Sequence, residues 1–369
     1  MKHLLTFLIA SIGLISCSSK QPQTPELAEI TIPERHEKDS VFFNQFELQS
    51  MIVLDSSNKA IAGNIKRLII NDKHIYILSR HIHKFNLDGK FICQIGNPGK
   101  SGSEYRQIID FTIDEKNGTI IVFSDDYKLI YYTLDGEYIK HERLDDKRLI
   151  DAMQIVNGDL YLYCKTKYKE HEKLIHRFIN NKFVDYKELE VADFLDKSRG
   201  FNFGENFVKG KSILFSQNAD NKIYELKDDT INVRYRITDY QFITEETKKE
   251  ITKTDSNIGM VLFKNNAVVG YSSIRETDYG IFMKNNLSSI IWIEPNNTVH
   301  NFRYIKDDRI SQASLRYVAH DANDNLVAFV ADPMYIVKRK LQYPDPEIEA
   351  RLQTITEDSN PVLLFYKHK

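Results

Sequence analysis

Short apolar segments recur along the chain, and a polar or Gly/Asn-containing turn introduces each of them. The segments are "NDKHIYIL" near Tyr76, "EKNGTIIVF" near Val122, "VNGDLYLY" near Leu162, "VKGKSILF" near Leu214, "KNNAVVGY" near Val269 and "ANDNLVAF" near Val327. Their spacing of roughly 40 to 60 residues is typical of repeated units that contain four antiparallel strands. The pattern therefore predicts an all-β chain of six repeats.

Second turns support four strands in each repeat. They occur at "NLDG" (Asn86 to Gly89), "TLDG" (Thr133 to Gly136), "KDD" (Lys227 to Asp229) and "PNN" (Pro295 to Asn297), each between apolar segments. Asp-Gly pairs in such positions form hairpin turns. Six units of four antiparallel strands describe a six-bladed β-propeller. Blades four and five fit the pattern least well, and their strand count stays open.

The two ends of the repeat region predict how the ring closes. "FELQSMIVLD" (Phe46 to Asp55) and "NPVLLFYKHK" (Asn360 to Lys369) are both strand-like, whereas the sixth repeat lacks its outer two strands. We expect these N- and C-terminal strands to pair and to complete blade six. A partly helical insertion covers 332–360, where Pro346 begins a predicted short helix with Leu352 on its apolar face.

Composition agrees with a strand-rich folded chain. The 369 residues are 42% hydrophobic and 28% charged, with 21 Phe and 20 Tyr against 15 Gly. Abundant aromatic residues favour strands. The net charge of -2 gives no reason to expect nucleic acid as a partner, because neutralising phosphates requires a concentrated excess of Lys and Arg.

The N-terminus has the features of an export signal with a lipid attachment site. Lys2 precedes an apolar segment, Leu4 to Ile15, that is too short to span a bilayer but typical of a signal peptide. The following "LISC" resembles the lipobox of bacterial lipoproteins, which implies a diacylated Cys17. The alternative is an ordinary secretory signal with an incidental cysteine.

The predicted organisation is a signal peptide at 1–16, a tether at 17–40 and a propeller domain at 41–369. The tether begins with the polar "SSKQPQTPE", which is typical of a flexible linker. Several acyl chains on one cysteine give stable membrane attachment. Because "SSKQP" lacks the acidic cluster that marks many surface-exported lipoproteins, we expect an outer-membrane protein on the periplasmic side rather than on the cell surface.

The remaining cysteines, Cys93 and Cys164, lie in apolar strand-like segments of different repeats. An exported compartment permits a disulfide, but non-adjacent blades place them too far apart for one. We expect two buried free thiols.

A Gly-Lys-Ser sequence within "QIGNPGKSGSEY" raises the question of a nucleotide-binding P-loop. That motif needs a glycine five residues before the Gly-Lys pair, where this chain has Gln94. A helix must also follow so that its N-terminus faces the phosphates, but the next segment is strand-like. The glycines therefore require another explanation, which is the crossing of the chain from one blade to the next.

The first two blades resemble a known family. The segment "HKFNLDGKFICQIGNPGKSGSEYRQIIDFTID" is similar to the lipoprotein family of six-bladed propellers common in Bacteroidetes, which is related to NHL-repeat propellers. The matching positions are Phe85, Asp88, Gly89, Phe91, Ile95, Gly96, Gly99, Gly102, Glu104, Tyr105 and Asp110. The resemblance implies a six-bladed propeller tied to a membrane.

Loop length suggests where a ligand binds. In a propeller blade, the turns that join the first strand to the second and the third to the fourth lie on one face. These are tight here, whereas the connections of the opposite face hold the long segments, "SSIRETDYG" (Ser272 to Gly280) among them. Function concentrates in long loops on a rigid scaffold. The candidate binding residues on the long-loop face are Arg80, His81, Asp126, Tyr127, Arg199, Arg275 and Tyr279. The alternative for each is a solvated loop residue.

Catalytic and metal motifs give little support for an enzyme. His81 and His83 alternate along one strand, so both lie on one face, but no third metal ligand follows at a diagnostic spacing. The sequence contains neither a GxSxG elbow nor an HExxH motif. We therefore expect a binding or assembly module for a protein or glycan-like ligand, without a metal or other cofactor.

The alternative is an NHL-like hydrolase or lyase of the lactonase type, with calcium in the central channel and residues such as His81, Asp125 and Asp126 around it. Fold alone does not choose between the two functions. Three or more His, Asp or Glu side chains that converge in the channel would favour the enzyme.

Replacement of the lipidated cysteine tests the membrane anchor. Cys17→Ser removes the thiol that accepts the lipid, so we expect the protein to move from the membrane fraction to the soluble periplasmic fraction. Immunoblots of fractionated cells measure this. Unchanged membrane partitioning would contradict the lipid anchor.

Overall fold

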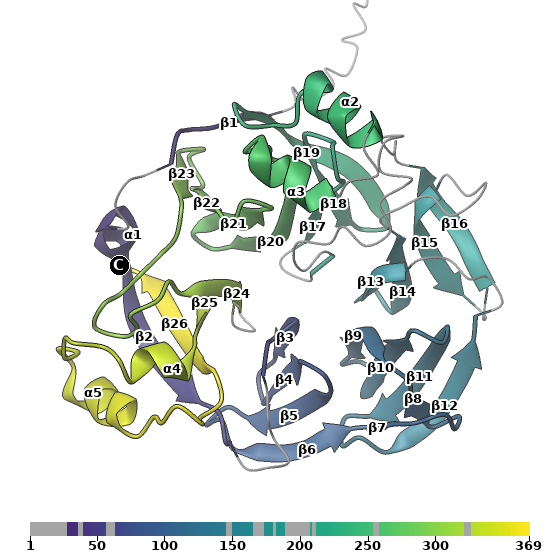
Figure 1. Ribbon diagram of the computed structural model, residues 1–369. Coiled ribbons are helices and arrows are strands. Elements are labelled where there is room, and N and C mark those ends of the chain that lie inside the picture. Colours follow the sequence, from purple (N-terminus) through teal and green to yellow (C-terminus); the bar gives the residue numbers. More distant parts are fainter. Residues whose placement is uncertain are drawn as a thin grey trace, which may run out of the picture.

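A computed structural model describes residues 28–35, 40–56, 63–144, 150–164, 173–179, 182–188, 207–208, 212–253, 258–320 and 326–369. Six four-stranded sheets are arranged around a central axis, as Figure 1 shows. The predicted all-β six-bladed propeller is confirmed.

Four blades are built from consecutive strands. Blade one contains β3 (Arg67–Ile70), β4 (His74–Leu78), β5 (Ile82–Asn86) and β6 (Phe91–Ile95). Blade two contains β9 (Ile108–Asp114), β10 (Thr119–Ser124), β11 (Lys128–Thr133) and β12 (Tyr138–Arg143). Blade three contains β13 (Ile150–Val156), β14 (Asp159–Cys164), β15 (Lys173–Ile179) and β16 (Lys182–Glu188). Blade five contains β20 (Tyr271–Thr277), β21 (Gly280–Asn285), β22 (Ile290–Ile293) and β23 (Val299–Phe302).

The hydrophobic core lies between neighbouring blades. Phe85 of blade one, for example, belongs to the same buried cluster as Leu363 and Phe365 of blade six. Each blade is a twisted sheet with apolar residues on both faces, so it buries them only against the blades on either side. The predicted Asp-Gly turns of blades one and two are also present, with Gly89 N–H bonded to Asn86 O and Gly136 N–H bonded to Thr133 O, both at 3.0 Å.

Blade six closes the ring with strands from both ends of the chain. It contains β24 (Arg316–His320), β25 (Val327–Ala331), β26 (Val362–His368) and β2 (Phe46–Val53). β2 pairs antiparallel with β26 from Phe46 opposite His368 to Val53 opposite Val362. The predicted closure by the N- and C-terminal strands is confirmed. The short helix α1 (Ser40–Gln45) leads into β2.

Blade four differs from the sequence prediction. Its sheet contains β17 (Ile213–Ser216), β18 (Lys222–Lys227), β19 (Thr230–Asp239) and, at the outer edge, β1 (Ala28–Ile32). An isolated bridge between Val208 and Leu214 lies on the inner side of β17. The segment 17–40 was predicted to be a tether, but part of it is the strand β1.

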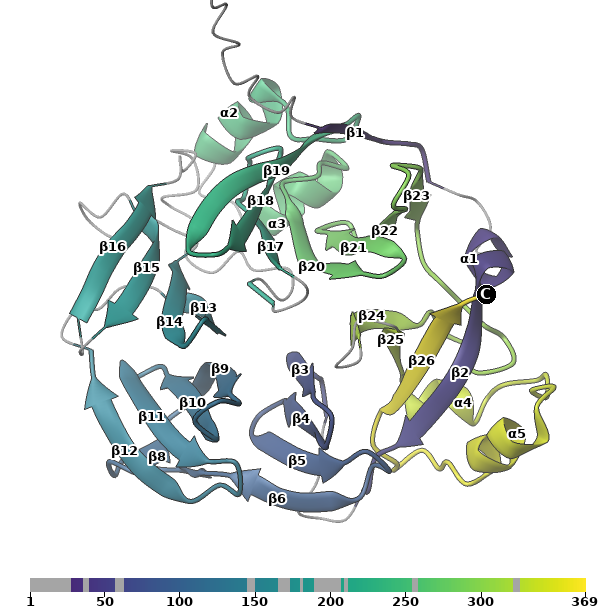
Figure 2. The same ribbon diagram turned by 180° about the vertical axis from the view of Figure 1, so that it is seen from behind.

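The strand β1 covers the outer edge of blade four. It runs parallel to β19, with Ile30 opposite Ile237, and both Ile30 and Ile32 are buried. Without it, the ten-residue strand β19 would be an uncovered edge, which proteins avoid because such an edge recruits other strands. Figure 2 shows β1 along the outer side of blade four.

Blade five corrects one strand assignment. The "KNN" of "KNNAVVGY" was predicted to be the turn that introduces a strand, but its Lys264 is the last residue of the helix α3 (Ile258–Lys264), which comes after α2 (Glu245–Lys253). β20 begins only at Tyr271. The segment "SSIRETDYG" was predicted to be a long loop and is instead most of β20 with its turn to β21. The sequence of β20 does not alternate regularly between apolar and polar residues, and Arg275 and Glu276 lie near its end. This pattern is typical of a loop, which is why the strand was not predicted.

The insertion between β25 and β26 contains two short helices, α4 (Pro333–Ile336) and α5 (Pro346–Gln353). The side chain of Asp345 caps α5 by accepting hydrogen bonds from the backbone N–H groups of Glu347 and Ile348. Leu352 of the same helix is buried against blade six. The predicted helix at Pro346 is confirmed. Within the described part of the chain, no helix is long and apolar enough to cross a membrane.

Ring closure can be tested in the closing strand itself. Leu364 of β26 is fully buried in the core of blade six, whereas Lys367 of the same strand is exposed. We expect Leu364→Ala to lower the free energy of unfolding by about 2–5 kcal/mol through lost burial and a cavity. Lys367→Ala is the matched control and should stay within about 0.5 kcal/mol of wild type.

Urea unfolding measures both variants. Deletion of 360–369 should go further and abolish cooperative unfolding, because β2 then has no partner. A deletion variant that melts like wild type would show that the β2–β26 pairing does not hold the ring.

Candidate functional site

The long-loop face is the face of the propeller that carries the connections between second and third strands and between blades. Arg80 and His81 join β4 to β5, and Asp126 and Tyr127 join β10 to β11. Both connections link the second strand of a blade to its third, so these four residues lie on the predicted face. Arg199 lies outside the described residues.

Arg275 and Tyr279 do not belong to this face. Arg275 lies within β20, and Tyr279 lies in the turn between the first two strands of blade five, which is on the opposite face. The Tyr279 ring stacks on His368 at 5.2 Å between centroids, and its carbonyl accepts a hydrogen bond from Trp292 Nε1 at 2.8 Å. The assignment failed because "SSIRETDYG" is a strand and a tight turn. Tyr279 supports the core beside the closing strand.

Asp126 and Tyr127 are engaged in local structure. Asp126 lies 3.2 Å from Nζ of the fully buried Lys128. Tyr127 has a positive φ of 60° and its ring packs partly buried against the core of blades one and two. These two residues shape the connection between β10 and β11.

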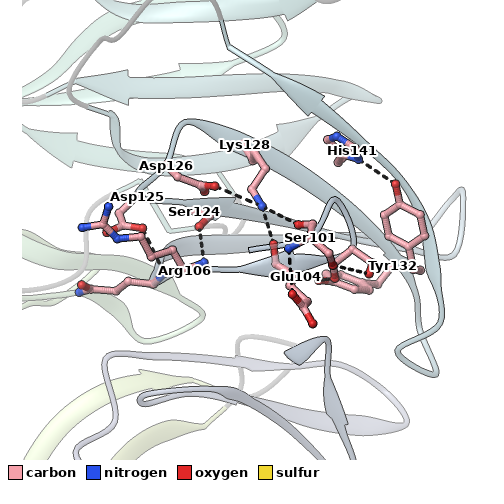
Figure 3. Close-up of polar contacts among 12 residues, drawn as sticks. Ser101, Glu104, Arg106, Ser124, Asp125, Asp126, Lys128, Tyr132 and His141 are labelled. Atoms are coloured by element: carbon pink, nitrogen blue, oxygen red, sulfur yellow. Dashed lines mark hydrogen bonds and ion pairs between the residues drawn. The ribbon is translucent and has the colours of Figure 1, made fainter. Parts of the chain in front are cut away.

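The glycine-rich crossing between blades one and two is anchored by blade two. Lys128 Nζ donates to the carbonyls of Ser101 at 3.0 Å and Glu104 at 2.6 Å, and Tyr132 Oη donates to Ser103 O at 2.7 Å. Figure 3 shows these contacts converging on the crossing segment. Within it, β7 (Asn97–Pro98) pairs with β8 (Glu104–Tyr105). The crossing is therefore held from inside the protein.

Two of its glycines allow close approach of other side chains. Gly96 has φ of +64°, and a Cβ there would collide with the Tyr132 hydroxyl. A Cβ at Gly99 would collide with the Glu104 carboxylate, which accepts a hydrogen bond from Ser101 N at 2.8 Å. That backbone hydrogen bond lowers the pKa of Glu104. Packing accounts for these glycines, and no phosphate is needed to explain them.

A cavity of about 1090 Å³ opens on the long-loop face over blade one. Its walls come from the residues before β3, the connection between β4 and β5, the strands β5 and β6, and the glycine-rich crossing. Its volume lies just above the usual range of roughly 300–1,000 Å³ for small-molecule sites. The cavity includes two of the predicted residues, Arg80 and His81.

Two imidazoles line this cavity. His81 Nδ1 lies 2.8 Å from the Tyr105 hydroxyl, and burial, with Arg80 beside it, lowers the pKa of His81. Burial and the neighbouring His81 also lower the pKa of His83, against the opposite effect of a hydrogen bond with Gln94. Both rings are therefore neutral at pH 7.

His83 has an unsatisfied nitrogen. The residue is only 3% exposed, and its buried Nδ1 has no hydrogen-bond partner among the described residues. A buried polar atom without a partner carries a cost of about 1–3 kcal/mol. Because His83 lines the cavity, a ligand could supply the missing hydrogen bond only if the side chains that cover Nδ1 move aside.

The described lining carries positive charge. Lys66, Arg80 and Arg106 line the cavity, and none of the described lining residues is acidic. Arg106 lies 3.4 Å from Asp125, which stands outside the lining. The other main surfaces are the ring of Phe91 and the amides of Asn64, Gln94, Asn97 and Gln107, whereas Tyr105 is buried in the wall.

Sequence analysis missed most of this lining. Lys66, Gln94, Tyr105 and Arg106 were not among the candidate residues. The available signal was the position of "GNPGKSGSEYRQ" next to the candidates of blade one. That segment is the adjacent connection on the same face, and this position alone would have assigned its polar side chains to the site.

Titratable groups near the axis serve the fold. Nη1 of Arg67 in β3 donates to both carboxylate oxygens of Asp110 in β9, at 2.7 and 2.8 Å, and Nη2 donates to Oε1 of Gln154 in β13 at 2.9 Å. Asp110 also accepts a hydrogen bond from Met153 N at 2.7 Å. Arg67 and Asp110 are buried. This network joins the inner strands of three blades.

In the described part of the chain, no three His, Cys, Asp or Glu side chains gather as a metal ligand set. Cys93 and Cys164 are both free; Cys164 is buried as predicted, and Cys93 is half-buried.

The chain belongs to the family described as "Domain of unknown function (DUF4934)", whose model matches residues 29–367. In fold it is similar to a protein of Bacteroides fragilis whose name describes it as exported, with 19% identity, a TM-score of 0.74, and coverage of 93% of this chain and 100% of that one. A member of the DUF4221 family from Bacteroides vulgatus is 9% identical with a TM-score of 0.51, covering 88% and 99%.

Virginiamycin B lyase from Staphylococcus aureus is 13% identical with a TM-score of 0.42, covering 88% of this chain and 99% of that one. A similarity at that level carries no argument about chemistry. None of the curated proteins matches this sequence. The comparisons show the family and the fold of the chain, and they assign no function to the cavity.

The protonation state of the two imidazoles gives a direct test of the site. Their folded pKa values are lowered, so the unfolded chain takes up protons first as the pH falls. Their contribution to stability is full above about pH 6.5 and is lost as the pH falls below it. We expect NMR titration of His81 and His83 to give midpoints below 6.5. A midpoint at or above 6.5 for either ring would contradict the electrostatics described above.

Proposed function

We propose that this protein is an exported, lipid-anchored propeller that binds a protein or glycan-like ligand in the cavity over blade one, without turnover. The observation that supports this most is the lining of that cavity. It combines the unsatisfied Nδ1 of His83 with cationic, amide and aromatic side chains. Ligand sites are typically concave, partly aromatic and equipped with a few fixed polar groups.

The rigidity of the walls supports a binding role. Lys128 and Tyr132 hold the glycine-rich crossing, and Tyr105 holds the His81 ring. Side chains that are fixed before the ligand arrives lose little conformational entropy on binding. The cavity is therefore organised in advance.

The position of β1 supports a short membrane tether. If Cys17 carries the lipid, ten residues separate it from Ala28 at the start of β1. An extended segment of that length spans at most about 36 Å. We propose that this tether keeps blade four near the outer membrane on the periplasmic side. The relationship to NHL-repeat propellers also stays a prediction.

A hydrolase or lyase is the second candidate because of one observation. His81 is a neutral imidazole hydrogen-bonded to Tyr105 at the cavity wall, and a neutral imidazole can act as a general base. Calcium would bind only through amide and carbonyl oxygens there, since the described lining lacks carboxylates.

A blocking variant tests the proposed binding site. Gln107 lines the cavity and is exposed, so Gln107→Trp should obstruct the site without disturbing the core. Glu115→Trp, at an exposed turn on the opposite face, is the matched control. We expect the full-length protein in detergent to bind members of a glycan and peptide array, Gln107→Trp to lose this binding, and Glu115→Trp to keep it.

Binding that survives Gln107→Trp would place the ligand elsewhere and contradict the proposal. Conversion of a bound ligand by wild type, abolished by His81→Gln, would replace the binding function with the enzymatic one.

A further inference from the structure

We infer that the ligand of the cavity over blade one is an acidic carbohydrate, a glycan that carries uronic-acid carboxylates. This inference rests on the proposed function and adds the chemical class of the ligand. It draws on the charge of the lining, the free acceptor on His83, and the kinds of side chain between them.

The charges of the cavity favour an anion. Lys66 and Arg80 are exposed at the cavity, and neither side chain forms an ion pair or a hydrogen bond with another described residue. Arg106 is paired only with Asp125 and is 72% exposed. The described lining supplies no carboxylate to balance them. Two cationic side chains without protein partners on one side of a concave site match carboxylates of a ligand.

The His83 ring adds a demand for a hydrogen-bond donor. Its Nδ1 has no partner, so the hydrogen bond with Gln94 falls on Nε2. Gln94 uses its amide nitrogen to bond Gly96 O at 2.9 Å, which leaves its oxygen as the acceptor for Nε2–H. The neutral ring then presents Nδ1 as an acceptor. Nδ1 is covered in the structure, so a ligand hydroxyl would satisfy it after the covering side chains shift, whereas a carboxylate, which only accepts hydrogen bonds, would not.

The remaining lining fits sugar rings. Asn64, Asn97 and Gln107 offer amides that both donate and accept hydrogen bonds, as ring hydroxyls do. Phe91 is partly exposed and offers a flat apolar surface among them, whereas the Tyr105 ring is buried behind the wall. A ligand with carboxylates, many hydroxyls and apolar ring faces is an acidic glycan. An acidic peptide would satisfy the cations but presents few hydroxyls to these amides.

Calorimetry with matched ligands tests the inference. The probes are a trimer of galacturonic acid, the same trimer with every carboxylate methyl-esterified, and a hexa-aspartate peptide, each titrated into the full-length protein in detergent. We expect the acidic trimer to bind, the ester to bind at least about tenfold more weakly because charge-assisted hydrogen bonds are lost, and the peptide to bind more weakly than the acidic trimer.

Variants assign the contacts. Lys66→Gln and Arg80→Gln should each reduce the preference for acid over ester, and Lys116→Gln, an exposed lysine on the opposite face, should leave it unchanged. His83→Phe should weaken the binding of the acidic trimer and of its ester by the same factor, because it removes the acceptor for a ligand hydroxyl. The new ring would lie beside Phe85 and Phe91. Melting temperatures establish that each variant is folded. If His83→Phe is unfolded, the effect of Lys66→Gln and Arg80→Gln on the preference for acid over ester still tests the inference.

The outcomes separate this inference from the proposed function. Equal affinity for acid and ester, or tighter binding of the peptide than of the acidic trimer, would overturn the acidic-glycan inference and leave a binding cavity in place. Binding of none of the three probes would overturn the inference as well, and the array with Gln107→Trp then judges the binding function independently.

Discussion

The pairing of β2 with β26 is the constraint on which the rest of the molecule depends. A propeller buries its apolar side chains only between blades, so every blade needs a neighbour on both sides. The covalent chain alone cannot supply this between the last blades and the first, because β2 leads into blade one whereas the other three strands of blade six, β24 to β26, come from the C-terminal end of the chain. The β2–β26 ladder supplies it, and the Asn360 amide, bonded to Asp55 O at 2.5 Å, fixes the end of the closing strand where the chain leaves for blade one.

The candidate site follows from this closure. Asp55 N–H bonds Gly89 O in the last turn of blade one, so the closing strand and blade one share backbone contacts. The segment after β2 then provides Lys66 to the cavity wall, and Arg67 next to it anchors the inner strands of blades one to three. Lys66 thus faces the cavity, while the neighbouring Arg67 links the inner strands of the blades. Breaking the buried Arg67–Asp110 pair would leave an unpaired charge in the core, which is strongly destabilising.

Local patterns in the sequence were enough to predict the six repeats, the Asp-Gly turns, the ring closure and the helix at Pro346. Each of these depends on residues close together in the chain or on strands with strong apolar patterns. β1 was missed because its five residues lie in a polar segment and pair with β19 some two hundred residues away. The first strand of blade five was missed because polar residues interrupt its apolar pattern.

The site was predicted only in part for a related reason. Arg80 and His81 were identified from loop position, but a cavity is formed by segments that the fold brings together. Lys66, Gln94 and Arg106 come from three such segments, and no spacing in the sequence links them. The assignment of Tyr279 failed with the strand register of blade five.

Hydrogen–deuterium exchange of the full-length protein, with and without a saturating galacturonate trimer, tests the central claim most directly. A ligand in a cavity that is organised in advance slows exchange of the backbone that lines it and leaves the opposite face unchanged. We predict slower exchange at residues 79–83 and 94–107, with no change at the turns 115–118 and 278–279. Slower exchange at those turns, or none in the cavity segments despite saturation, would contradict the account.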